Sequence, residues 1–195
     1  PVSTIAHVLQ EEGWLVGAVS SVPISHATPA AAYAHNVSRD DYQDLTRDLL
    51  GLPSVAHPQQ PLPGLDVIIG GGFGARAKQA DGVKKQGQNF VEGHVYLTDQ
   101  DLQAADVQSG GKYTTAVRTA GVDGTVVLNA AAAAAATKKT RLLGFFGQGN
   151  NGGHLPFATA DGDYVPSPGV GKKAETYEAA DLQENPTLAE MTAAA

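Results

Sequence analysis

The sequence of 195 residues contains no cysteine, which excludes disulfide bonds, thiolate zinc sites and cysteine nucleophiles. It also lacks an apolar run of the roughly 20 residues that a membrane-spanning helix needs, so no membrane span is expected. Positive charge is scarce, because 13 Lys and Arg stand against 20 Asp and Glu, for a formal net charge of -7. Nucleic-acid affinity comes mostly from cations that meet phosphates, so no nucleic-acid binding is expected. Any phosphate that this chain binds must be held at a local site.

The chain has the composition of a folded protein but lacks a recognisable start. Apolar residues make up 42% and charged residues 17%, a balance that favours a domain with a real core. The chain begins at Pro1 without a methionine or a signal peptide, and a helix predicted from Asn185 is uncapped at Ala195. Both features predict a processed or truncated product, so the missing signal says nothing about export.

Short apolar runs alternate with segments of helical pattern, which favours an α/β fold with a parallel sheet. The predicted strands are Trp14–Val19, Leu65–Ile69, Lys112–Val117 and Arg141–Phe146. Ser3 or Thr4 caps a first predicted helix that Gly13 ends, and Thr98 with Asp101 opens another. A run of seven alanines predicts a helix over residues 125–138, because alanine is the best helix former.

The remaining segments predict connections within one unit that spans residues 1–195. Residues 51–64 carry four prolines and predict a surface connection, and the polar, glycine-rich residues 73–93 predict an exposed excursion. Residues 147–186 are rich in Gly, Pro, Asn and Asp and predict a long irregular loop. Loops of that length are usually functional, disordered or parts of a larger assembly.

The loop after the first predicted strand carries candidate metal-binding residues. Pro29 suits the first position of a helix over residues 29–35 and biases Thr28 toward an extended conformation. Residues two apart in an extended stretch point the same way, so His26 and Thr28 can face one site. A threonine hydroxyl is a hard oxygen ligand suited to magnesium. The alternative interpretation is that Thr28 only caps the helix and His26 is a surface residue.

Arg39 is the candidate phosphate ligand. Ser38 and Asp41 form a capping pattern that places Arg39 in the first turn of a helix ending near Leu50. A guanidinium there can hold two phosphate oxygens with parallel hydrogen bonds. A continuous helix would put Thr28 and Arg39 about 16 Å apart, so a shared site requires a break near Asn36. The alternative is an ion pair of Arg39 with Asp40 or Asp44 on a solvated surface.

Other glycines and histidines give weaker signals. The segment from Gly70 to Gly74 fits neither the Walker nor the dinucleotide spacing, so a tight strand exit is favoured over nucleotide binding. His154 lies near Asp161 and Asp163, without the regular spacing of a calcium loop. His7 and His57 have no partner in sequence, and His35 is interpreted as a C-terminal cap of the first predicted helix after Pro29.

Taken together, seven segments make the chain similar to the central part of alkaline phosphatases, especially bacterial ones. They occur in family order and run nearly from end to end. The segments are Ser3-Thr-Ile-Ala, Gly17-Ala-Val-Ser20, Ser25-His-Ala-Thr-Pro-Ala-Ala31, His35-Asn-Val-Ser-Arg39, Asp66-Val-Ile-Ile-Gly-Gly-Gly72, Arg141-Leu-Leu-Gly-Phe-Phe-Gly147 and Asn185-Pro-Thr-Leu-Ala-Glu-Met191.

The resemblance implies a periplasmic or secreted, usually dimeric phosphomonoesterase with an α/β/α sandwich, two zinc ions, one magnesium ion and a phosphoserine intermediate. By position, Thr28 resembles the hydroxyl ligand of magnesium, and Arg39 resembles the arginine that binds the substrate phosphate. His26 resembles a residue that lies beside the magnesium ion without binding it directly. Phosphoryl transfer relies on such positioning and charge neutralisation.

The sequence departs from the family pattern because several catalytic parts have no match in it. The nucleophilic serine is expected before Pro1, the zinc ligands before Pro1 or after Ala195, and the glutamate ligand of magnesium after Ala195. The resemblance therefore implies that the 195-residue chain alone is inactive toward phosphomonoesters. A non-catalytic fragment, or a module that binds phosphate or a partner, is the alternative function.

Overall fold

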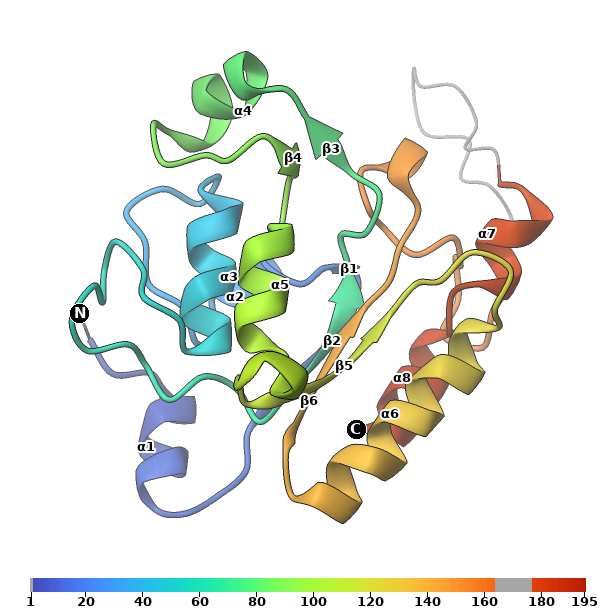
Figure 1. The fold of residues 1–195 in the computed structure, drawn as a ribbon, viewed down its shortest axis with the longest axis horizontal. Helices are drawn as coiled ribbons and strands as arrows, with labels where there is room; N and C mark the ends of the chain where they lie inside the picture. The colour runs from blue at the N-terminus through green and yellow to red at the C-terminus, as the bar shows by residue number, and fades with distance from the viewer. Residues whose placement is uncertain (1, 164–176) are drawn as a thin grey trace.

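A computed structural model describes residues 2–163 and 177–195, and a parallel sheet forms the centre of this part of the chain (Figure 1). Its strand order is β1-β2-β6-β5. The strands are β1 (Gly17–Pro23), β2 (Val67–Gly71), β5 (Tyr113–Val117) and β6 (Arg141–Phe145). The register pairs Gly17 with Val67 and Val67 with Leu142, so the three strands run side by side from the same level.

Helices cover both faces of this sheet. Successive strand residues point to opposite sides, so each face carries apolar side chains that a helix layer buries. Ile68 and Leu143 belong to a buried cluster shared with α3 (Tyr42–Leu50) and α5 (Asp99–Ala105). The neighbouring Ile69 and Leu142 belong to a second cluster, shared with α6 (Gly124–Lys138) and α8 (Leu188–Ala194). The predicted α/β/α sandwich is therefore confirmed.

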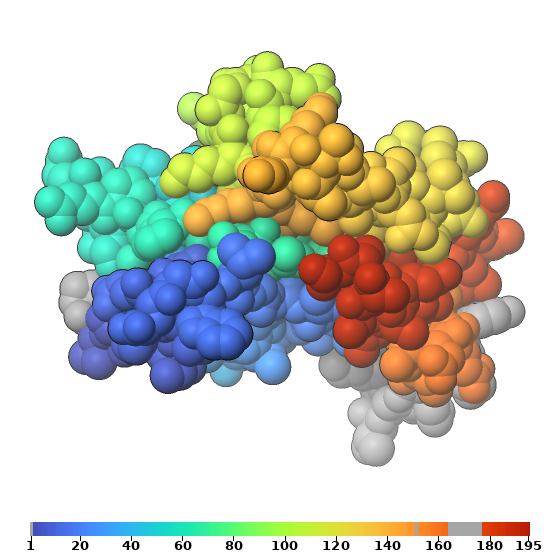
Figure 2. All heavy atoms as spheres, turned by 90° about the horizontal axis from the view of Figure 1, so that it is seen from below, coloured from blue at the N-terminus to red at the C-terminus, as the bar shows by residue number. Residues whose placement is uncertain are grey.

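The remaining elements are short and lie at the edges of the sandwich. They are α1 (Ile5–Glu11), α2 (Ala27–Ala30), β3 (Arg76–Ala77), α4 (Gln79–Gln86), β4 (Gly93–His94), η1 (Val107–Ser109), η2 (Gly149–Asn151) and α7 (Ala179–Gln183). The N-terminal and C-terminal segments come to the surface on one face of the molecule (Figure 2). In the part of the chain that the structure describes, no helix is both long and apolar enough for a membrane span.

Local signals located several helix ends correctly. The hydroxyl of Thr4 accepts a hydrogen bond from the backbone N–H of His7, and that of Thr98 accepts one from Asp101. The alanine-rich helix α6, predicted from residue 125, begins at Gly124, and its cap is Asp123, which the prediction did not include and which accepts from the N–H groups of Thr125 and Val126. These signals depend only on residues within one turn, so they can be read without knowledge of the fold.

Other boundaries differ from the prediction. The first strand was predicted at Trp14–Val19 but is Gly17–Pro23. Trp14 and Leu15 lie on the surface, with exposed fractions of 67% and 83%, and are not part of the core. The last helix begins at Leu188, where Thr187 caps it. Among its described residues, the long irregular loop predicted over residues 147–186 contains only the short helices η2 and α7. Residues 164–176 of that loop lie outside the described part of the chain.

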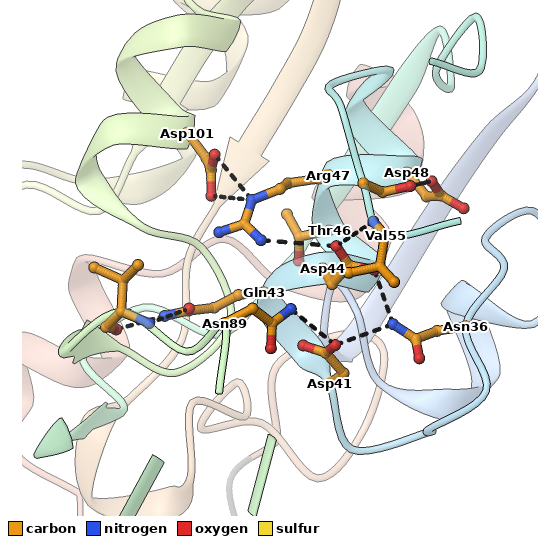
Figure 3. Close-up of polar contacts among 12 residues, drawn as sticks. Asn36, Asp41, Gln43, Asp44, Thr46, Arg47, Asp48, Val55, Asn89 and Asp101 are labelled. Carbon is orange, nitrogen blue, oxygen red and sulfur yellow. Dashed lines mark hydrogen bonds and ion pairs between the residues drawn. The ribbon is translucent and has the colours of Figure 1, made fainter. Parts of the chain in front are cut away.

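Helix α3 fastens its neighbours through buried polar side chains (Figure 3). The amide of Gln43 donates to the carbonyl oxygens of Val91 and His94, at 2.8 and 2.7 Å. The guanidinium of Arg47 donates to the Asp101 carboxylate at 3.1 Å, which ties α5 to α3. Helix α3 therefore contacts residues 91–94 and α5 through hydrogen bonds as well as through apolar packing.

Candidate functional site

The predicted site residues lie beyond the carboxyl end of β1. Strands β1, β2 and β6 are parallel and end at Pro23, Gly71 and Phe145, so their carboxyl ends share one edge of the sheet. In open α/β sheets, ligands bind in the crevice outside that edge. The segment that follows β1 is therefore in the place where this fold offers a binding site.

The glycines after β2 form a tight strand exit, as predicted, rather than a phosphate cradle. Gly72 has φ +121°, and a Cβ atom there would lie 2.7 Å from the Phe145 ring. Its N–H donates to the carbonyl oxygen of Gly153 at 2.7 Å, and the N–H of Phe73 donates to that of Phe146 at 2.8 Å. These donors are already satisfied by the protein, so they do not point to a nucleotide.

Helix α2 places His26 and Thr28 differently from the prediction. The helix was expected over residues 29–35 but spans Ala27–Ala30, with His26 as its N-cap. Thr28 is therefore helical and exposed, and the alternation of an extended chain does not apply to it. His26 keeps an extended backbone, with φ -65° and ψ 160° for its N-cap position.

Arg39 lies in a turn before α3 rather than in its first turn. The helix begins at Tyr42 with Asp41 as N-cap, and it ends as predicted at Leu50 before the left-handed Gly51. The helix breaks between Thr28 and Arg39, as a shared site requires, but at Ala30 and not near Asn36, and the chain stays non-helical from there to α3.

The Arg39 guanidinium is exposed and has no ion pair within residues 2–163 and 177–195. The alternative partners are engaged elsewhere. Asp44 Oδ1 lies 3.7 Å from Arg47, and Asp40 Oδ1 accepts a hydrogen bond from the Tyr42 hydroxyl at 3.0 Å. The surface ion pair considered for Arg39 does not form, which leaves its donors available to a ligand.

Aromatic and cationic side chains gather around Tyr42. The His26 ring stacks on the Tyr42 ring with centroids 6.0 Å apart, and Lys85 Nζ lies 5.3 Å from the Tyr42 centroid. The His154 ring meets His26 edge-on at 5.7 Å. We call His26, Arg39, Tyr42, Lys85 and His154 the Tyr42 cluster.

The electrostatics of the Tyr42 cluster favour an anion. Burial, and then the positive charges of Arg39 and Lys85, lower the pKa of His26 below its ordinary value, while Asp40 acts in the opposite direction. His26 and Arg39 are therefore close enough to interact through their charges. Neutral His26 adds no positive charge near pH 7, so Arg39 and Lys85 carry the cationic character of the cluster.

No sequence pattern indicates that Lys85 or His154 belongs to the site. Lys85 belongs to α4, in the segment predicted as an exposed excursion, and His154 was considered with Asp161 and Asp163 instead. Both residues join the cluster through contacts between distant segments. No local pattern reports such contacts.

Sequence comparison decides the family. A family model described as "Alkaline phosphatase" matches residues 1–195, which is the whole chain. The chain belongs to the alkaline phosphatase family. The resemblance stated from its seven segments is therefore confirmed.

Curated relatives in this family match parts of the chain. The tissue-nonspecific alkaline phosphatase of Gallus gallus is 40% identical over 76 residues, which are 36% of this chain and 15% of that protein. The alkaline phosphatase of Gadus morhua is 32% identical over 109 residues, or 47% of this chain and 23% of that protein. The human tissue-nonspecific enzyme is 37% identical over 76 residues, or 36% of this chain and 14% of that protein. The matched stretch is thus less than a quarter of each of these alkaline phosphatases.

Proposed function

We propose that this chain is one segment of an alkaline phosphatase catalytic domain and supplies the grip on the phosphoryl group of a phosphomonoester. The observation that supports this proposal most directly is the exposed Arg39 guanidinium. It has no ion pair in the described part of the chain and lies near Lys85 and His26. Family membership supports phosphomonoester hydrolysis as the reaction of the complete enzyme. A homodimer and a periplasmic or secreted location are proposals from the family alone.

Arg39 would hold two oxygens of the phosphoryl group through parallel N–H donors. Such a clamp orients the phosphorus for in-line attack and neutralises charge on its oxygens. Lys85 would add a second positive charge from α4. Tyr42 fixes both neighbours, because its ring lies against His26 and Lys85 and its hydroxyl is held by Asp40.

Thr28 and His26 are proposed for the magnesium site. The exposed Thr28 hydroxyl fits a neutral oxygen ligand, and the lowered pKa of His26 fits a neutral imidazole beside a cation. Magnesium and zinc would supply charge stabilisation at the reacting oxygens when bound. No residue of this chain is proposed as a ligand of the two catalytic zinc ions or as the serine nucleophile.

Replacing Arg39 by alanine is expected to weaken inorganic phosphate binding about 10-fold or more, because hydrogen bonds to charged groups contribute roughly 1.5–3 kcal/mol. Isothermal titration of phosphate into the chain measures this. Arg39→Lys keeps the charge but loses the planar fork, so it should recover only part of the affinity.

Lys138→Ala is the matched control, since it removes an exposed cation from α6 on the other face of the sheet. Its phosphate affinity should equal that of the unchanged chain. Equal affinity of Arg39→Ala and the unchanged chain would refute the role of Arg39.

The 195-residue chain by itself is expected to bind phosphate without hydrolysing phosphomonoesters, because none of its residues is assigned as nucleophile or catalytic zinc ligand. The measurement is release of a chromogenic alcohol from its phosphomonoester with zinc and magnesium present. Zinc-dependent turnover by the pure chain would contradict this expectation.

A further inference from the structure

A second group of titratable side chains lies near the far end of α3 from Arg39. His7 of α1, His35 and His57 gather beside Asp48, which is in the last turn of α3 and has a side chain with no exposed surface. The His35 ring centroid lies 5.4 Å from that of His7 and 5.3 Å from that of His57. Asp48 and Tyr42 are separated by about 9 Å along the helix axis, so this group is apart from the Tyr42 cluster.

The hydrogen bonds of His35 fix which of its nitrogens is bare. Its Nε2 lies 2.7 Å from the carbonyl oxygen of Val2, which can only accept, so Nε2 carries the proton. The Nδ1 atom of the neutral ring then presents a lone pair. That atom is buried, has no hydrogen-bond partner in the described part of the chain and lies 3.9 Å from Asp48 Oδ2.

This arrangement leaves an acceptor facing a carboxylate. A lone pair and a carboxylate oxygen repel each other unless a cation or a proton lies between them. A ring nitrogen that donates to a backbone carbonyl, with the other nitrogen bare, is the usual arrangement of a histidine that binds a metal.

His57 approaches the same carboxylate from the loop between α3 and β2. Its Nδ1 lies 3.0 Å from Asp48 Oδ1. One ligand atom each from His35, Asp48 and His57 lies within 4.8 Å of the others. Zinc bonds to nitrogen and oxygen are about 2.0–2.2 Å, which places tetrahedral ligand atoms roughly 3.4 Å apart. Small side-chain rotations bring the three atoms to that spacing.

We propose that Nδ1 of His35, Nδ1 of His57 and the carboxylate of Asp48 bind a structural zinc ion, with water in the fourth position. Imidazole nitrogens with one carboxylate suit zinc and not magnesium or calcium, which take oxygen ligands. On binding, Nδ1 of His57 must present its lone pair, so the ring proton that it shares with Asp48 moves to Nε2 through solvent and the ring stays neutral.

His7 borders this site without joining it. Its Nδ1 accepts a hydrogen bond from the backbone N–H of Thr4 at 3.1 Å, so Nε2 carries the ring proton and has no lone pair to offer. Burial, and then the charges of His35 and His57, lower the pKa of His7. A neutral His7 against the site adds no positive charge that would oppose zinc.

The bound ion would fasten three segments that are distant in sequence. His35 follows α2, Asp48 is in α3, and His57 is in the proline-rich connection. Without metal, the same residues form a hydrogen-bonded anchor, because Asp48 also accepts from the Ser54 hydroxyl and from the backbone N–H of His35. A zinc site makes the stability of the chain depend on zinc, whereas a hydrogen-bonded anchor does not, so the effect of zinc on stability distinguishes the two roles.

The test is thermal unfolding of the chain with zinc chloride at about 100 times the dissociation constant, where the melting temperature should rise by roughly 5–10 °C. His57→Gln keeps an N–H donor for Asp48 but removes the ligand nitrogen, so it should abolish most of that rise. His94→Gln is the matched control and should keep the full rise, because His94 packs against Phe73 and Phe145 and belongs to neither proposed site. An equal rise in His57→Gln, or no rise in the unchanged chain, would overturn the proposal.

A second measurement needs no variant. In ¹⁵N spectra of the unchanged chain, zinc should move the Nδ1 resonances of His35 and His57 and leave that of His26 in place. Zinc-induced shifts at His26 and His154 instead would place the metal in the Tyr42 cluster and refute this site. Neither experiment measures phosphate binding, so their results do not depend on whether Arg39 binds phosphate.

Discussion

Replacing Arg118 by alanine is expected to lower the free energy of unfolding by about 3–5 kcal/mol, because it leaves two buried carboxylates without their counter-charge. The Arg118 guanidinium donates to Glu184 Oε2 at 2.9 Å and to Asp181 Oδ1 at 2.8 Å. The exposed fractions of the three side chains are 12% for Arg118, 12% for Asp181 and 9% for Glu184. So large a loss is a substantial part of the stability of an ordinary domain.

The contacts of Arg118 explain why its removal would destabilise several segments at once. A third donor of the guanidinium reaches the carbonyl oxygen of Gly147 at 2.8 Å, just beyond the end of β6. Glu184 also accepts from the backbone N–H of Gly121 at 2.7 Å. One side chain thus joins the exits of β5 and β6 to α7, and its removal frees all three.

Urea unfolding of the two variants Arg118→Ala and Arg39→Ala provides the measurement and its control. Both delete an arginine side chain, but Arg39 is exposed and has no ion pair in the described residues, so its loss should change stability by less than about 0.5 kcal/mol. Arg118→Lys should recover part of the loss by keeping one charge. Similar unfolding midpoints for Arg118→Ala and Arg39→Ala would contradict the assigned role of Arg118.

The elements that the sequence predicted correctly are those whose cause is local. Helix α6 needs only its alanines and the Asp123 cap, and α5 needs only the Thr98 hydroxyl. The first strand was misplaced because an apolar run was equated with burial. Trp14 and Leu15 are exposed in the structure, and the hydrogen-bonded register with β2 starts at Gly17. Pairing with a strand some 50 residues away cannot be read from the run itself.

The same distinction applies to the two sites. A shared site for Thr28 and Arg39 required a break near Asn36, and the chain leaves the helix earlier than that, because α2 ends at Ala30. The sequence did not predict that Arg39 lies outside α3, since Ser38 and Asp41 mimic a cap while the Asp41 backbone is the actual N-cap. His35 was interpreted as a helix cap, but α2 ends at Ala30 and its ring instead meets His7, His57 and Asp48. Those partners come from three separate segments.

Replacing Phe145 by alanine is expected to lower the free energy of unfolding by about 3–5 kcal/mol, since the site cannot collapse around the lost ring. Phe145 is 1% exposed and ends β6 in the cluster beneath α3 and α5. Its ring meets those of Phe73 and His94 edge-on, each with centroids 6.0 Å apart. These neighbours follow β2 and belong to β4, so the ring supports the strand exits that lead to the Tyr42 cluster.

Phe157→Ala provides the comparison, because Phe157 is only half-buried at the margin of the second cluster and its truncation leaves less empty volume. Urea unfolding should show a clearly smaller loss of stability for Phe157→Ala than for Phe145→Ala.

Gly72 provides a second test of the packing around Phe145, because a Cβ atom at this position would lie 2.7 Å from the Phe145 ring. Phe145→Ala opens that space, so Gly72→Ala should cost less stability in the Phe145→Ala background than alone. Additive losses in the double variant would show that Phe145 does not set the packing of this strand exit.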